Sequence, residues 1–196
     1  MRKARTRIDM ARRQQLIEAA YQTFLEHGIN GMTMARIGER AGMSHGIVNY
    51  YFKTKTELLS AVIRKANALI LQETSGRLRG LDDPRARISA VINAFFASHF
   101  FTREVARAWV SYYASIALVA EFERMQAMMD RRLTSNLCHA LRQLIPPERV
   151  KPAAFCIHMM IDGTWLHHAR TSEKLDGHSV VSNIEDYVDM LVAQRA

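Results

Sequence analysis

The clearest candidate site in the sequence is Thr33–Leu59, where residues follow the spacing of a helix-turn-helix. Thr33 can cap a short helix through its hydroxyl, and Gly42 can form the next turn because glycine readily adopts a positive φ. Ser44 can then begin a second helix, and Gly38 is small where the two helices would cross. The second helix of such a motif enters the major groove of DNA. This spacing therefore predicts a head that reads DNA.

A second set of candidate residues lies in the C-terminal half. It includes both tryptophans, Trp109 and Trp165, and Tyr113 follows Trp109 by about one helical turn. Asp162 precedes Trp165 by three residues, so the two can share one face of a helix. An acid on an otherwise apolar helix is costly to bury unpaired. Asp162 therefore predicts a nearby cation.

Two alternatives to a ligand site stay open for this set. Aromatic residues at helical spacing, such as Trp109, Tyr112 and Tyr113, form protein core more often than a ligand cage. Asp162 can also be neutralised by an arginine such as Arg131 or Arg132. The residues by themselves do not name a ligand.

Other chemistry is not indicated by the sequence. It contains no Ser-His-Asp spacing, phosphate-binding glycine loop or paired catalytic carboxylates, so we expect no enzyme activity, no catalytic residues and no cofactor. The remaining candidate metal ligands lack CxxC or HxxxH spacing, so we expect no metal site. They are Cys138, Cys156, His158, His167 and His168.

Composition places the chain among folded, basic proteins. Its 27 Lys and Arg against 19 Asp and Glu give a charge of +8, which suits a polyanionic partner. Two cysteines do not make a disulfide framework. The N-terminus lacks the apolar core of a signal peptide, and no apolar run approaches the roughly 20 residues that span a bilayer. We expect a cytoplasmic protein with no membrane contact.

Apolar periodicity at helical spacing predicts an all-α fold of about nine helices. We expect a basic arm over residues 1–13, disordered over Met1–Thr6, and a long helix that begins with a capping box at Thr54 and Glu57. Pro152 should begin a helix that is buried on every side, either in a core or at a subunit interface. The expected helices cover residues 10–27, 34–41, 44–51, 54–75, 84–100, 102–118, 120–144, 153–168 and 180–194.

These helices suggest two domains. Residues 1–53 would form a three-helix DNA-binding domain with its basic arm, and residues 54–196 a helical domain for ligand binding and dimerisation. The last two helices have apolar stripes that can pack on a second copy as a four-helix interface. A monomer can also bury the same stripes internally.

The N-terminal block resembles the TetR family of bacterial transcriptional repressors. The resemblance rests on Thr33-Met34-Ala35-Arg36-Ile37, Ala41-Gly42-Met43-Ser44, Gly46-Ile47, Tyr51-Phe52 and Lys55-Thr56-Glu57-Leu58-Leu59. Many members have Tyr at the position of Asn49 and His at the position of Tyr51, so the base contacts differ here. The resemblance implies a homodimer on a palindromic operator. The DNA contacts that it implies are Thr33, Ser44, His45, Gly46, Asn49, Tyr50, Tyr51 and Lys55.

Segments of the C-terminal half are similar to the choline-responsive repressors of that family. They are Arg107-Ala108-Trp109, Ala114-Ser115, Arg131-Arg132-Leu133, Ser135-Asn136-Leu137, Ile161-Asp162-Gly163 and Trp165-Leu166. This similarity implies a repressor of glycine betaine biosynthesis genes whose repression is relieved by choline, either by release from DNA or by an effect on the bound complex. It also implies a choline site, for which we expect Trp109, Tyr113, Asn136, Asp162 and Trp165.

Other functions remain open at this point. The main alternative is a repressor of a multidrug efflux gene that senses lipophilic cations. An architectural DNA-binding protein without an effector would bind any duplex equally, and nothing in residues 81–196 supports an enzyme joined to a DNA-binding head.

Overall fold

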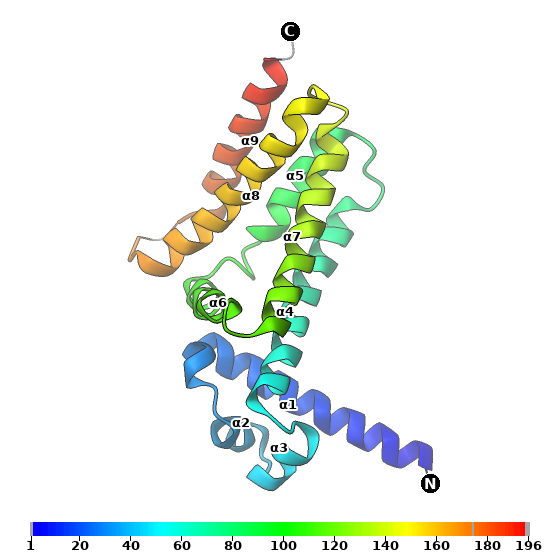
Figure 1. Cartoon of the computed structure of the whole chain (residues 1–196), viewed down its shortest axis with the longest axis vertical. Helices are drawn as coiled ribbons and strands as arrows, with labels where there is room; N and C mark the ends of the chain where they lie inside the picture. The colour runs from blue at the N-terminus through cyan, green and yellow to red at the C-terminus, as the bar shows by residue number, and fades with distance from the viewer. Residues whose placement is uncertain (1, 174, 195–196) are drawn as a thin grey trace. The chain divides into compact units, whose positions relative to one another are not determined.

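The computed structural model describes residues 2–173 and 175–194, which form α-helices joined by short loops, with no β-strand in these segments (Figure 1). This confirms the predicted all-α class and, for the described residues, the predicted number of helices. The helices are α1 Arg2–Gly31, α2 Met34–Ala41, α3 His45–Tyr51, α4 Lys55–Leu78, α5 Pro84–Phe95, α6 Arg103–Ile116, α7 Ala120–Leu141, α8 Pro147–Arg170 and α9 Gly177–Ala193.

The first helix is longer than predicted. The backbone of residues 2–6 continues α1, so the expected disorder is wrong for them, and Met1 lies outside the described residues. Residues 2–13 contain neither Gly nor Pro and are rich in Arg and Ala, which favour helix. The chain bends at Gly28, whose φ of 61° is non-helical, and a last turn ends at Gly31.

The eighth helix also differs from the prediction. It begins at Pro147, where the fixed φ of proline suits a first turn, and Pro152 lies inside it. This helix is not buried on every side within one chain, because Phe155, Met159 and Leu166 are exposed, so its predicted burial in a core or at a subunit interface stays a prediction for the interface. Other ends also shift: α4 continues past Gly76 to Leu78, α5 stops at Phe95, and α9 begins at Gly177.

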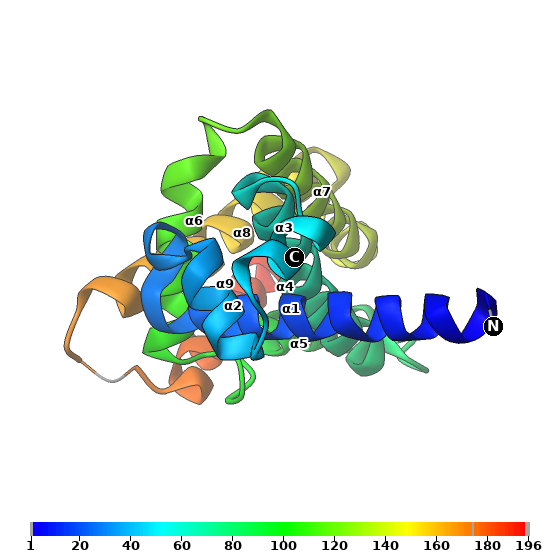
Figure 2. The same cartoon turned by 90° about the horizontal axis from the view of Figure 1, so that it is seen from below.

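The chain divides into two compact units. The first contains the described residues up to Ala68 together with Arg107–Phe122. Within it, α2 packs against α1 and α3 packs against α2, and the first turns of α1 extend beyond both (Figure 2). An Arg40–Glu26 ion pair joins α2 to α1. Its core contains Leu16, Phe24, Met32, Ile37, Val48, Phe52 and Leu58, which are fully buried.

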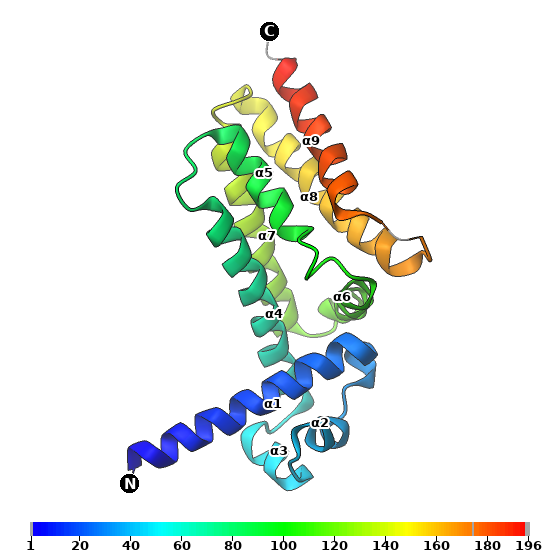
Figure 3. The same cartoon turned by 180° about the vertical axis from the view of Figure 1, so that it is seen from behind.

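The second unit contains Leu69–Ala106 and Glu123–Ala196. Here α9 packs against both α5 and α8 (Figure 3). Arg85 of α5 holds Asp189 of α9 with two bonds, Nε to Oδ1 at 2.6 Å and Nη2 to Oδ2 at 3.1 Å. The predicted boundary after residue 53 stays a prediction. No helix in the described segments is long and apolar enough to cross a membrane.

Candidate DNA-reading head and effector region

Local hydrogen bonds build the turn of the head. Thr33 Oγ1 accepts a bond from the Arg36 backbone N–H at 3.2 Å, which caps α2 as predicted. Gly42 ends α2 with a φ of 63°, a left-handed conformation that suits glycine. Ser44 Oγ then accepts from the Ile47 N–H at 3.4 Å and caps α3. The predicted caps and turn are therefore confirmed.

Gly38 sets how closely the turn approaches α2. A Cβ at this position would lie 2.7 Å from the backbone oxygen of Met43 and 3.1 Å from Cγ2 of Val48. The first distance is too short for a carbon beside a backbone oxygen. A side chain at residue 38 would therefore push the turn away from α2.

The residues predicted to contact DNA are accessible. Seven are exposed and Tyr51 is half-buried; the exposed ones are Thr33, Ser44, His45, Gly46, Asn49, Tyr50 and Lys55. Four of the eight line one depression of about 580 Å³ together with three residues of α1. The lining is Ile8, Asp9, Arg12, Ser44, Gly46, Ile47, Tyr50 and Tyr51.

Tyr51 is tied to the extended start of α1. Its hydroxyl donates to Asp9 Oδ1 at 3.0 Å, and burial together with this bond raises the pKa of Tyr51. Sequence reasoning did not connect Asp9 with the recognition helix, because no local pattern links residues so far apart.

The predicted capping box at the start of α4 differs in detail. Thr54 accepts from the Glu57 N–H as expected, whereas Glu57 reaches the N–H of Lys53.

The predicted ligand residues fall in both compact units. Trp109 and Tyr113 belong to the first unit, where Trp109 packs edge-on against Phe24 with ring centroids 6.4 Å apart. Tyr112 is fully buried and donates its hydroxyl to the Phe122 carbonyl at 3.2 Å. Tyr112 is thus a core residue, and Tyr113 beside it is partly exposed.

In the second unit, Asp162 has a histidine as its neighbour. Its Oδ2 lies 3.5 Å from Nε2 of His158, and Asp130 Oδ1 lies 3.7 Å from the same nitrogen. Burial raises the pKa of Asp162, His158 opposes that rise, and Asp130 adds to it. Neither Arg131 nor Arg132 forms a salt bridge with Asp162 in the described residues.

Trp165 and Asn136 have different surroundings. Trp165 is 7% exposed, and its ring meets Phe101 edge-on at a centroid distance of 5.3 Å. Asn136 is half-buried on α7. Among the residues predicted for the choline site, Trp165 thus borders an aromatic ring of the loop before α6.

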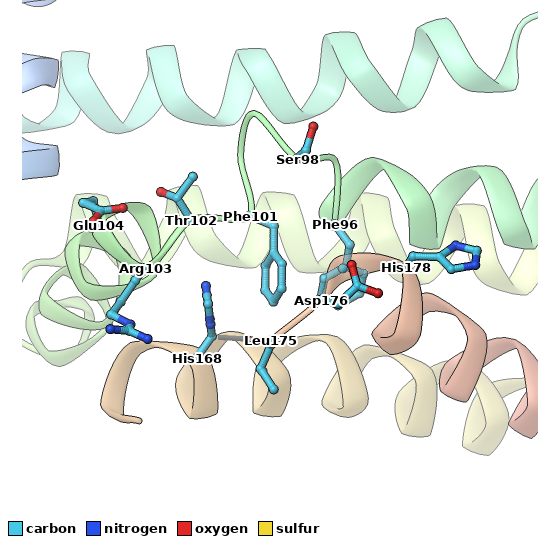
Figure 4. Close-up of a pocket in the computed structure, with 11 residues that line it drawn as sticks. Phe96, Ser98, Phe101, Thr102, Arg103, Glu104, His168, Leu175, Asp176 and His178 are labelled. Carbon is cyan, nitrogen blue, oxygen red and sulfur yellow. The ribbon is translucent and has the colours of Figure 1, made fainter. Parts of the chain in front are cut away.

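That loop forms part of a cavity of about 890 Å³, within the size range of small-molecule sites (Figure 4). The described wall residues do not include Asn136, Asp162 or Trp165. They are Phe96, Ser98, Phe101, Thr102, Arg103, Glu104, His168, Leu175, Asp176, Gly177 and His178. Among them, the sequence indicated only His168 as a candidate site residue, and only as a metal ligand. No local spacing could have grouped the loop before α6 with the two ends of the α8–α9 connection.

Comparison with known proteins identifies both halves of the chain. Residues 16–62 match the bacterial regulatory proteins of the tetR family, and residues 84–193 match the C-terminal region of the BetI-type transcriptional repressors. A relative from Burkholderia thailandensis, the HTH-type transcriptional regulator BetI, is 35% identical over 186 residues, which cover 94% of this chain and 95% of that protein.

Solved structures share the fold. A putative transcriptional regulator from Pseudomonas aeruginosa PAO1 has a TM-score of 0.80 at 23% identity, covering 94% of this chain and 91% of that one. A putative regulator from Saccharomonospora viridis, solved in complex with choline, has a TM-score of 0.79 at 14% identity, covering 90% of this chain and 95% of that one. Proteins of this family regulate transcription, which confirms that the chain is not an enzyme. The chain belongs to the TetR family of bacterial regulatory proteins, and it is a DNA-binding transcriptional repressor with a BetI-type C-terminal region.

Proposed function

We propose that this repressor controls genes for glycine betaine biosynthesis and that choline, bound in the C-terminal region, releases it from its operator. The BetI-type match over residues 84–193 supports this proposal, as does a full-length relative that carries the BetI name. The Saccharomonospora viridis structure adds a protein of the same fold in complex with choline.

The charge around Asp162 carries the choline part of the proposal. Two carboxylates, Asp162 and Asp130, share one imidazole, that of His158. Even a protonated His158 supplies a single positive charge against two negative ones. No Lys or Arg forms a salt bridge with either carboxylate within the described segments. The cluster therefore keeps a net negative charge that a small cation can neutralise.

A quaternary ammonium cannot donate N–H hydrogen bonds, so aromatic faces must supply the rest of its contacts. Each cation–π contact contributes about 0.5–2 kcal/mol, depending on desolvation. We propose Trp109, Tyr113 and Trp165 as the aromatic contacts, Asp162 as the counter-charge and Asn136 as the partner of the choline hydroxyl.

At the head, α3 would enter the major groove. Ser44 and Lys55 suit phosphate contacts as a hydroxyl donor and a cation. His45 and Asn49 carry groups that can read base edges, and Asn commonly reads adenine with two bonds. Thr33, Gly46, Tyr50 and Tyr51 complete the proposed surface.

We further propose that the repressor is a homodimer joined through α8 and α9. The exposed apolar side chains of these helices support this interface: Phe155, Met159, Leu166 and Met190. A groove of about 420 Å³ between the two helices has a mainly apolar lining that includes Met159, Val180 and Ile184. Burial of this surface in a two-fold interface would set two recognition helices on half-sites roughly 34–36 Å apart.

Release from DNA requires that choline binds two conformations of the dimer unequally. Helices α4 and α6 each contribute residues to both compact units, so both are candidate links. In the first unit, Ser111 Oγ of α6 accepts a bond from the Ile29 N–H at 2.9 Å, next to the bend at Gly28. A coupling free energy of about 1–3 kcal/mol would weaken operator binding about 5–150-fold.

A gel shift tests the proposal directly. Wild-type protein is bound to the DNA upstream of its gene and titrated with choline, in parallel with the Asp162→Asn variant. We expect choline to release the wild type, and the variant to bind DNA equally well while needing at least tenfold more choline. Asp82→Asn removes the same charge from an exposed loop and should respond like the wild type.

Asp162→Asn is a sharper test than Trp165→Ala. Trp165 is buried, and truncation of a buried Trp costs about 3–5 kcal/mol, so loss of the choline response would not separate binding from folding. Calorimetry with choline and with a bulky lipophilic dye cation completes the test. If millimolar choline leaves the DNA complex intact while the dye binds and releases it, the efflux alternative replaces the choline proposal.

A further inference from the structure

The cavity beside α6 contains a cation, Arg103, that forms no salt bridge with a carboxylate within residues 2–173 and 175–194. Arg103 begins α6, and its Nη2 donates to the Ser172 and Glu173 carbonyls at 2.5 and 3.2 Å. Its Nε is buried and has no hydrogen-bond partner in the part of the chain that the structure describes. An unpaired buried N–H on a charged group is costly, so this nitrogen favours an acceptor from a ligand.

His168 lies beside this guanidinium. It is 4% exposed, and its Nδ1 is buried without a hydrogen-bond partner among residues 2–173 and 175–194. Figure 4 shows its ring between Arg103 and Phe101, directed into the cavity. The ring stacks on Phe101 with centroids 4.4 Å apart and an interplanar angle of 24°. Arg103 Nε and His168 Nδ1, both without a hydrogen-bond partner in the described segments, thus belong to residues that line the same end of the cavity.

Asp176 and His178 lie at the opposite end of the cavity, and aromatic rings lie between the two ends (Figure 4). Phe96 and Phe101 meet edge-on at 5.1 Å. Beyond them, Asp176 caps α9 by accepting from the N–H and hydroxyl of Ser179, and these bonds lower its pKa, so it is ionised. Gly177 lets α9 begin close to the Phe96 backbone, because a Cβ at residue 177 would lie 2.8 Å from the Phe96 carbonyl oxygen.

This arrangement disfavours ligands that carry a single charge. A simple cation such as choline would leave Arg103 Nε unpaired, and a simple anion at Arg103 would leave Asp176 at the other end of the cavity without a counter-charge. A molecule with both charges matches both ends. We propose that this cavity binds a small zwitterion, with its carboxylate or phosphate group at Arg103 and His168 and its ammonium group over the phenylalanine rings toward Asp176. The inference does not depend on the proposed choline site at Asp162.

Binding of such a ligand should be linked to protons. Burial, Arg103 and His167 lower the pKa of His168, and Glu104 opposes them; Asp176, just before α9, and His178 of α9 also line the cavity. The ring is therefore neutral at neutral pH. A bound oxyanion would stabilise the imidazolium and raise the pKa of His168, so binding should take up a proton and strengthen as pH falls from 8 to 6.

Isothermal titration calorimetry of the full-length protein tests this, with glycine betaine as the carboxylate probe, phosphocholine as the phosphate probe and choline as the probe without an oxyanion. We expect at least one zwitterion to bind and to lose at least tenfold in affinity in Arg103→Gln. Arg170→Gln, an exposed arginine at the end of α8, should leave it unchanged. Choline affinity should not depend on Arg103. The preferred probe shows whether the cavity suits a carboxylate or a phosphate.

Proton uptake keeps the test decisive if Arg103→Gln fails to fold. Wild-type binding heats should vary with the ionisation enthalpy of the buffer, and His168→Gln should abolish that variation. The proposal is overturned if neither zwitterion binds at 10 mM, or if binding is independent of both Arg103 and pH. Arg103-dependent zwitterion binding without any choline effect on operator DNA would sustain this inference while refuting the choline proposal.

Discussion

The DNA-reading head consists of α2, α3 and the turn between them, and the effector region consists of Asp162 with its neighbours and the cavity beside α6. The contacts that form these two regions differ in how far apart their residues lie in the sequence. In the head, each predicted cap or turn lies within a few residues of its partner, as for Thr33 with Arg36 and Ser44 with Ile47. In the effector region, the cavity joins the loop before α6 to the end of α8 and the start of α9. Short-range bonds leave a sequence pattern, whereas a cavity assembled from distant segments does not.

The difference extends to how the two regions tolerate substitution. In the head, the backbone of the turn at Met43 lies so close to Gly38 of α2 that no side chain fits at residue 38. Ligand binding in the effector region is proposed to depend on charged side chains, such as Asp162 beside His158 and Arg103 in the wall of the cavity. We therefore expect steric changes to have the largest effects in the head and charge changes to act selectively in the effector region.

The largest expected effect comes from Gly38→Val. The added side chain would collide with the Met43 backbone oxygen and the Val48 side chain, and overpacking of this kind costs up to about 3 kcal/mol. Urea denaturation should show that loss, and operator binding should disappear in a gel shift. Gly76→Ala is the matched control, because a Cβ there meets nothing within 4 Å. It should be neutral or stabilise α4 by up to about 1 kcal/mol. Equal stability of Gly38→Val and wild type would contradict the steric account.

A smaller effect is expected from Phe155→Glu, which tests whether operator binding requires a dimer joined through the exposed face of α8 and α9. Phe155 is 61% exposed, so the chain should fold normally, but a charge in a two-fold interface is unfavourable. We expect dimer dissociation to be at least a hundredfold easier by sedimentation, with parallel loss of operator affinity. Leu118→Glu, at an exposed position between α6 and α7, should remain dimeric. An unchanged dimer in Phe155→Glu would move the interface elsewhere.

The smallest expected effect is a change in how the free energy of unfolding depends on pH in Asp162→Asn. Burial raises the pKa of Asp162 above its ordinary value of 3.8, so the folded state holds its proton more tightly than the unfolded state. The resulting stabilisation is fully present below the ordinary pKa and is lost as pH rises through the raised one. At pH 7 without choline, the variant should therefore be at least as stable as wild type. Thermal melts at several pH values measure this, and saturating choline should favour the wild type.

Much of the head could be predicted, and less of the effector region. The pattern at Thr33, Gly42 and Ser44 was correct because capping and turn geometry are local. The prediction that residues 2–6 are disordered was wrong, because these residues favour helix and form the first turns of α1. The helix expected to begin at Pro152 begins at Pro147, whose fixed φ suits a first turn, and Pro152 lies inside it.

By itself, the sequence determined the helical class, the position of the turn and the residues that cap it, because those interactions span one turn of chain. Only the tertiary structure decided that Asp9 binds Tyr51, that His158 lies between Asp130 and Asp162, and that Arg103 and His168 meet in one cavity. Those contacts depend on how helices pack, which short-range spacing does not encode.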